Sequence, residues 1–88
     1  SRTESPPPKG PDAGPLEVMV GRETLALYEA ALARLPEQQQ EAFMLRIEMG
    51  CGYREIAEAL GRPSATAARL LVRRAIVRLA HELSLAQE

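Results

Sequence analysis

The sequence predicts a small all-α domain: four helices that include a helix-turn-helix. Apolar residues recur at helical spacing from Leu25 onward, and no alternating pattern typical of a strand occurs in the 88 residues. Aromatic residues make up only 3% of a chain that is 45% hydrophobic, so Leu, Ala, Ile, Val and Met must form the core, which favours closely packed helices. Glycine and proline fall between the periodic segments and mark their ends. A chain of this length forms one domain with a small core.

The first twenty residues are predicted to be a disordered, proline-rich linker. Residues 1–15 hold most of the prolines and no large apolar side chain, so they have little surface to bury. The sequence turns helical from Leu16, and we expect the first helix over about residues 22–35. The folded domain is expected to occupy residues 21–84, with a frayed tail over residues 85–88. Because the chain has no initiating Met, we expect it to be a fragment whose linker joins another domain.

The remaining helices are expected at about 36–49, 53–60 and 64–83. Pro36 suits the first position of a helix, and Gly50 is expected to end that helix. In the next helix, Ile56, Ala57 and Leu60 form one apolar face. We predict that the core closes on these three residues together with Leu32, Leu45, Leu71, Ala75 and Leu79.

The turn between the last two helices has the residues of a helix-turn-helix. Gly61 stands where a left-handed C-cap residue is expected, because glycine has no Cβ to disfavour that conformation. Pro63 blocks continuation of the first helix, and Ser64 is a good N-cap for the second. The small Ala57 faces the turn, so the two helices are expected to cross there at close range. In this motif the second helix enters the DNA major groove.

The last predicted helix has one apolar side and one side whose only charges are arginines. No acidic residue lies between Glu58 and Glu82, whereas five arginines do. Solvated helix faces usually mix charges of both signs, so this face favours neutralisation of DNA phosphates over a plain solvated surface. The net charge is only −1, because acids outnumber arginines by eight to four from Glu17 to Glu58. One acidic half and one basic half indicate two different binding surfaces.

The sequence argues against an enzyme and against a cofactor or metal site. Cys51 is the only cysteine, so no intrachain disulfide can form, and between two glycines it is expected to be a partly buried filler. His81 has no clustered ligand or nucleophile and is expected to sit near the C-terminal end of a helix. No signal peptide and no membrane-spanning run is found, so we expect no membrane partner and a cytoplasmic protein.

Three pieces of the sequence resemble region 4 of the bacterial sigma factors, most closely the group with extracytoplasmic function. They are Leu35-Pro36-Glu37 opening a helix that ends in Leu45-Arg46, the run GYREIAEALG from Gly52 to Gly61, and Arg74-Ala75 followed by Arg78-Leu79. All three occur in one frame over about residues 22–83. The resemblance implies a domain that recognises the −35 promoter element and docks on the flap of the RNA polymerase β subunit. It also implies anti-sigma factors as frequent partners.

The recognition helix departs from that family. Many members begin it with a Thr-Val-Lys-Ser-Arg type run, whereas SATAAR from Ser64 to Arg69 offers fewer polar groups, and the segment from Gly61 to Ala75 is one residue longer. Three functions therefore stay open. We favour a sigma-factor promoter-binding domain over the helix-turn-helix output domain of another transcriptional regulator, and over a sigma-like domain that binds only protein partners.

Two sets of residues are assigned to DNA and one to a protein partner. The major-groove set is Ala65, Thr66, Arg69, Leu70 and Arg73. The phosphate set is Arg54, Arg62 and Arg74. The partner set is the apolar stripe of Leu25, Tyr28 and Leu32, because the first two helices are rich in Glu and their stripe is broader than a small domain can cover.

Overall fold

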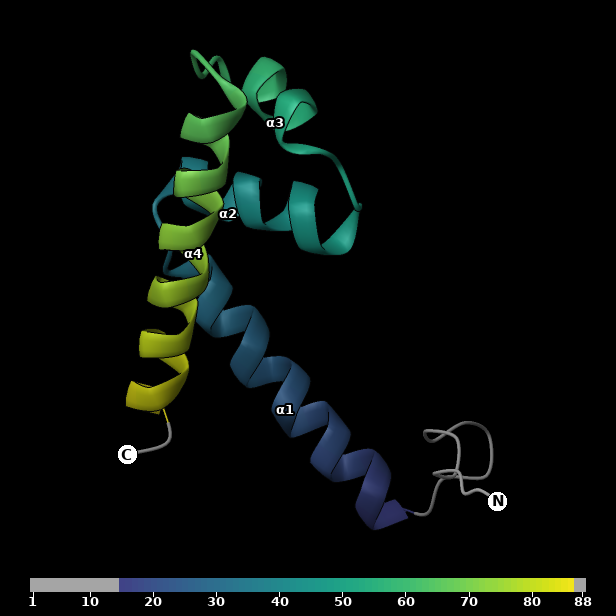
Figure 1. Cartoon of the computed structure of the whole chain (residues 1–88). Helices are drawn as coiled ribbons and strands as arrows, with labels where there is room; N and C mark the ends of the chain where they lie inside the picture. Colours follow the sequence, from purple (N-terminus) through teal and green to yellow (C-terminus); the bar gives the residue numbers. More distant parts are fainter. Residues whose placement is uncertain (1–14, 87–88) are drawn as a thin grey trace, which may run out of the picture.

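The computed structural model describes residues 15–86, which form helices joined by short connections (Figure 1). In chain order these are α1 (Pro15–Ala33), α2 (Glu37–Phe43), the π-helix η1 (Met44–Glu48) that continues α2, α3 (Tyr53–Leu60) and α4 (Ala65–Ala86). The predicted small all-α domain with a helix-turn-helix is confirmed. Within residues 15–86, no helix is both long and apolar enough to cross a membrane.

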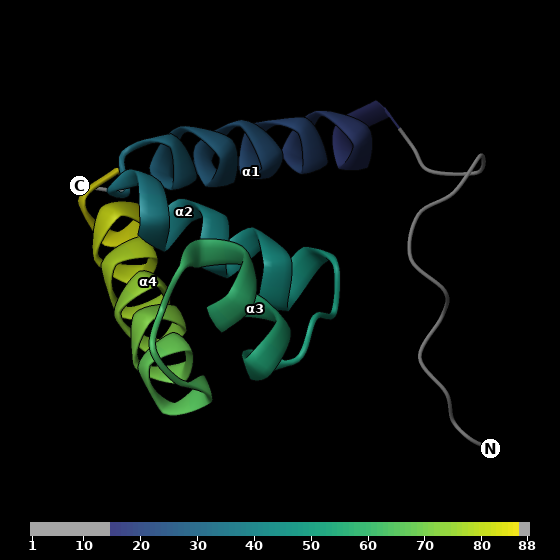
Figure 2. The same ribbon diagram turned by 90° about the horizontal axis from the view of Figure 1, so that it is seen from above.

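Helix α4 is the common wall of two hydrophobic clusters, and α1, α2 and α3 lie on one side of it (Figure 2). The first cluster joins the end of α1 to Phe43 of α2 and to Ala75 and Leu79 of α4. The second cluster joins α2 and α3 to the first half of α4 through Ala42, Ile56, Ala57, Ala68, Leu71 and Val72. Because both clusters share α4, the position of α4 depends on all the other helices.

The predicted core is largely confirmed. Six of the eight residues are buried: Leu32, Ile56, Ala57, Leu71, Ala75 and Leu79. The other two, Leu45 and Leu60, are half-buried and pack against the edge of the second cluster. Both lie on short helices with a single packed side, so an apolar residue near the margin of that side stays partly open to solvent.

The predicted linker and tail are wrong where they overlap helices. Helix α1 begins at Pro15 and ends at Ala33, so residues 15–20 are helical, while the rest of the predicted linker lies outside the described residues. Proline fits the first turn of a helix, and a helix that is already packed at one end adds further turns at little cost. For the same reason α4 continues to Ala86, past the predicted end at residue 83. Residues 87 and 88 lie outside the described part of the chain.

The predicted helix over residues 36–49 contains a change of helix type that the sequence did not indicate. Pro36 is the N-cap of α2 and accepts a hydrogen bond from the Gln40 amide at 2.9 Å, so the helix starts one residue later than expected. In η1 the Met49 amide donates to the Met44 carbonyl, five residues back, at 3.0 Å. Gly50 then adopts a φ of +73° and ends the segment, as predicted.

Candidate nucleic-acid interface

The turn between α3 and α4 has the geometry expected of a helix-turn-helix. Gly61 is left-handed, with a φ of +70°, and the Arg62 amide donates to the Ala57 carbonyl at 2.8 Å. Ser64 caps α4, because its Oγ accepts a hydrogen bond from the Ala67 amide at 3.1 Å. The predicted roles of Gly61 and Ser64 are therefore confirmed.

Small residues let α3 and α4 approach closely, which fixes the direction of α4. Ala57 on α3 is 5% exposed, and Ala68 on α4 is fully buried in the same cluster. A side-chain bond from α2 supports the end of α3, where Gln38 Nε2 donates to the Leu60 carbonyl at 3.1 Å. Both alanines are buried in one cluster, as the predicted crossing at Ala57 requires, and α2 supports the end of α3.

The outward face of α4 carries every residue assigned to the major groove. All five are exposed: Ala65, Thr66, Arg69, Leu70 and Arg73. They occupy the first nine residues of α4, and in a docked helix-turn-helix it is the N-terminal part of the second helix that meets the base edges. Their exposure and position are those that the assignment requires.

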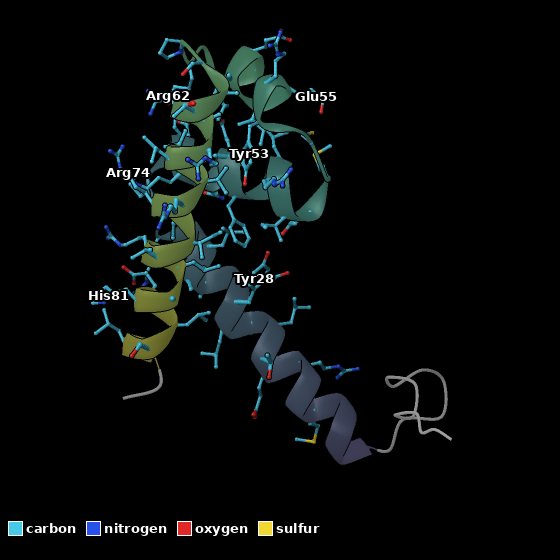
Figure 3. The ribbon with its side chains drawn as sticks, viewed as in Figure 1. Tyr28, Tyr53, Glu55, Arg62, Arg74 and His81 are labelled. Atoms are coloured by element: carbon cyan, nitrogen blue, oxygen red, sulfur yellow. The ribbon has the colours of Figure 1, made fainter. Side chains whose placement is uncertain are left out.

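The three residues assigned to phosphates occupy two places. Arg54 and the half-buried Arg62 line a hollow at the turn, next to Ser64 and the first residue of α4. Glu58 lines the same hollow and weakens its positive charge. Arg74 projects from the side of α4 that faces away from the other helices (Figure 3). The structure thus places two arginines beside the start of α4 and one along its flank.

The single carboxylate of α4 is buried and turned away from this face. Glu82 is 7% exposed, and its Oε2 accepts a hydrogen bond from Arg78 Nε at 2.9 Å. Its Oε1 lies 3.6 Å from Nη1 of Arg34, at the end of α1. The bond from Arg78 lowers the pKa of Glu82 against the opposing effect of burial, with smaller contributions from Arg34 and His81. The outward face of α4, as far as Ala86, is therefore free of carboxylates.

Tyr53 is a residue of this surface that was not singled out from the sequence. It is half-buried at the start of α3 (Figure 3). It lines a hollow with Arg69 and Arg73 of α4. The Arg46 guanidinium lies 4.2 Å from the centre of the Tyr53 ring and donates to the Cys51 carbonyl at 3.0 Å. In the sequence, Tyr53 is only an aromatic residue followed by charges of both signs. This pattern is too common to assign the residue to a DNA-binding surface.

The apolar stripe assigned to a partner is only partly available. Leu25 is 53% exposed, but Leu32 is buried in the first cluster, so its predicted partner role is wrong. Tyr28 is half-buried; its ring packs on Phe43, with the ring centroids 6.3 Å apart, and its hydroxyl donates to Glu48 Oε2 at 2.5 Å. That hydrogen bond to Glu48, helped by burial, raises the pKa of Tyr28 to about 12. The contacts of Tyr28 join α1 to η1.

Two other residues were considered in the sequence, Cys51 and His81. Cys51 is half-buried against the second cluster, as expected of a filler. His81 is exposed on α4, on the same side as Arg74 (Figure 3).

Comparison with known proteins gives one match. The family described as Sigma-70, region 4 matches residues 25–79, which include the end of α1, all of α2, η1 and α3, and most of α4. No curated protein and no solved structure matches the chain.

Proposed function

The chain belongs to the sigma-70 region 4 family, the promoter-binding part of sigma factors, and from this premise we propose that it reads the −35 element with α4. The observation that carries the proposal is the outward face of α4. This face presents arginines and small or apolar groups, and the only carboxylate of α4, that of Glu82, is buried on the other side of the helix. A surface of this kind neutralises phosphates without repelling them.

In this proposal the exposed side chains among the first nine residues of α4 lie in the major groove. Arg69 and Arg73 supply hydrogen-bond donors for base edges, and Thr66 adds a hydroxyl and a methyl group. Arg54 and Arg62 contact phosphates beside the turn, and the other assigned phosphate residue, Arg74, contacts them along the helix.

Titration of labelled promoter duplex at two salt concentrations tests this assignment. Replacing Arg69 by alanine should reduce discrimination between promoter sequences. Replacing Arg74 by alanine should weaken binding to all duplexes alike and lower the salt slope by about one. Arg22→Ala, an exposed arginine of α1, is the matched control and should change neither quantity. Wild-type affinity and slope in both α4 variants would refute the groove assignment.

A second surface, on α1, is proposed to bind protein. Residues 21–27 are all exposed, and this half of α1 extends away from the other helices (Figure 1). It carries Leu25 on the same side as Tyr28, together with the exposed carboxylates Glu23 and Glu29, which are unsuited to a phosphate backbone. In this proposal the partner is the flap of the RNA polymerase β subunit, or an anti-sigma factor that occupies the same surface.

A charged substitution on that surface tests whether the protein partner and DNA bind different faces. Leu25→Glu should abolish capture of the β flap in a pull-down while leaving duplex affinity nearly unchanged. Ala26→Glu is the control, because successive residues point about 100° apart around a helix. Retention of the flap by Leu25→Glu, or loss of DNA binding by a variant that is folded by circular dichroism, would refute the two-face arrangement.

Membership of the extracytoplasmic-function group and a cytoplasmic location, where the polymerase acts, are part of the same proposal. The family match favours a sigma-factor role over the output domain of another regulator. If the duplex titration detects no binding, a domain that binds only protein partners is the better assignment.

A further inference from the structure

An aliphatic side chain lies in the middle of the arginine-bearing face of α4. Leu70 is 41% exposed, and it belongs to neither hydrophobic cluster. Its neighbours one helical turn away on the same face are Thr66, Arg73 and Arg74. A single exposed leucine is common on protein surfaces, so its exposure alone carries no information. Its position among the residues assigned to DNA is informative.

The depth of Leu70 along α4 matches the part of a recognition helix that meets bases. It is the sixth residue of α4, about 7.5 Å from the first at 1.5 Å per residue. Val77, which is 67% exposed on the same side, lies about 10.5 Å further along the helix. Because the N-terminal residues of a docked recognition helix contact base edges, Leu70 lies at the depth of the bases in the proposed complex and Val77 lies beyond them.

The major groove offers one apolar group to such a side chain. Thymine carries a 5-methyl group there, while the other groups exposed on the base edges are hydrogen-bond donors and acceptors. A leucine pressed against a donor or acceptor removes its water and returns no hydrogen bond, which is unfavourable. Against a methyl group the same leucine buries apolar surface from both partners.

We infer that Leu70 makes the recognition helix selective for thymine, by packing its side chain against the 5-methyl group of one base in the site. This inference rests on the proposed DNA-binding function. The neighbouring arginine Arg73 lines two hollows, one with Leu70 and one with Tyr53, so its aliphatic stem flanks the leucine on one side. Arg74 flanks the leucine on the other side and lines the hollow that it shares with Leu70. The leucine is thus bounded by one arginine assigned to base edges and by one assigned to phosphates.

The test uses the full 88-residue chain and duplex DNA selected by it from a randomised pool. In the selected duplex, each thymine is replaced in turn by deoxyuridine, which keeps the base pairing and removes only the methyl group. At one thymine the wild-type chain should bind about fourfold more weakly after replacement, the equivalent of about 0.8 kcal/mol for one buried methyl group. The other positions should change by less than about twofold.

Variants assign that effect to one side chain. Leu70→Ser should bind the thymine and deoxyuridine duplexes equally well, and Leu70→Ala should show the same loss if the serine variant folds poorly by circular dichroism. Val77→Ser makes a comparable change beyond the bases and should keep the fourfold ratio. Three results would overturn the inference and leave the arginine face as the DNA surface. The selected duplex could contain no thymine, the wild-type chain could bind equally well after every thymine replacement, or the Leu70 variants could keep the fourfold ratio between the thymine and deoxyuridine duplexes. Absence of binding to any duplex, even at low salt, would overturn the proposed function itself.

Discussion

Replacing Ala57 by leucine tests whether the close approach of α3 and α4 sets the geometry of the helix-turn-helix. Ala57 is 5% exposed and shares its cluster with Ala68, which is fully buried. The three extra carbons of leucine crowd this crossing, because the side chain at this position is almost fully buried. Overpacking of this kind costs about 1–3 kcal/mol. For a domain of this size the whole free energy of unfolding is roughly 4–11 kcal/mol, so the loss is a substantial part of it.

Thermal unfolding followed by circular dichroism measures the effect. A loss of 1 kcal/mol lowers the melting temperature of so small a domain by about 4–8 °C, so Ala57→Leu should melt about 4–24 °C below the wild type. Ala59→Leu is the matched control, because it makes the same change at an exposed position of the same helix and should melt within a few degrees of wild type. Duplex affinity should fall with Ala57→Leu even below its melting temperature, because the start of α4 is displaced. Equal melting temperatures for the two variants would show that the helices cross elsewhere.

Three further changes test other contacts. Ser64→Ala removes the cap of α4 and should lower the free energy of unfolding in urea by about 0.5–2 kcal/mol, whereas Ser84→Ala, exposed in the same helix, should not. Because the pKa of Tyr28 is raised from 10.0 to about 12, its stabilising contribution is complete below pH 10 and is lost as pH rises towards 12. The melting temperature of Tyr28→Phe should therefore fall less steeply than that of the wild type over this alkaline range. Because the pKa of Glu82 is lowered, its contribution to stability is present above its ordinary pKa and is lost as pH falls through the lowered value. Glu82→Gln should therefore be less stable than wild type at pH 7, and its melting temperature should fall less steeply as the solution is made acidic.

The helix-turn-helix could be predicted closely because its signals are local. Gly61 and Ser64 act on their own backbone neighbourhood, so residue type and spacing were enough to place the end of α3 and the start of α4. The buried side of α4 followed from its period for the same reason. The start of α1 could not be placed in this way, because residues 21–27 are all exposed and no buried stripe marks this part of the helix.

The burial of Glu82 could not be predicted from the sequence, because it depends on two cations from different parts of the chain. Arg78 lies one turn away on the same helix, but Arg34 approaches from the end of α1, 48 residues earlier. The structure buries Glu82 and leaves its apolar neighbour Leu83 only half-buried. A carboxylate between two guanidinium groups can occupy a core position that its polarity alone would exclude. The partner role assigned to Leu32 was wrong for a similar reason, because the sequence does not show that α4 covers this residue.

The two sides of α4 separate folding from recognition. Ala68, Leu71 and Val72 hold the helix in one cluster, and Ala75 and Leu79 hold it in the other. The outward residues assigned to base edges belong to neither cluster, so we expect a change there to alter recognition, as proposed above, and to leave the packing of the helix intact. This separation makes the departure of the recognition helix from the common run of its family compatible with an unaltered fold. It also means that a loss of DNA discrimination in a variant of the outward face, with an unchanged melting temperature, reports on recognition alone.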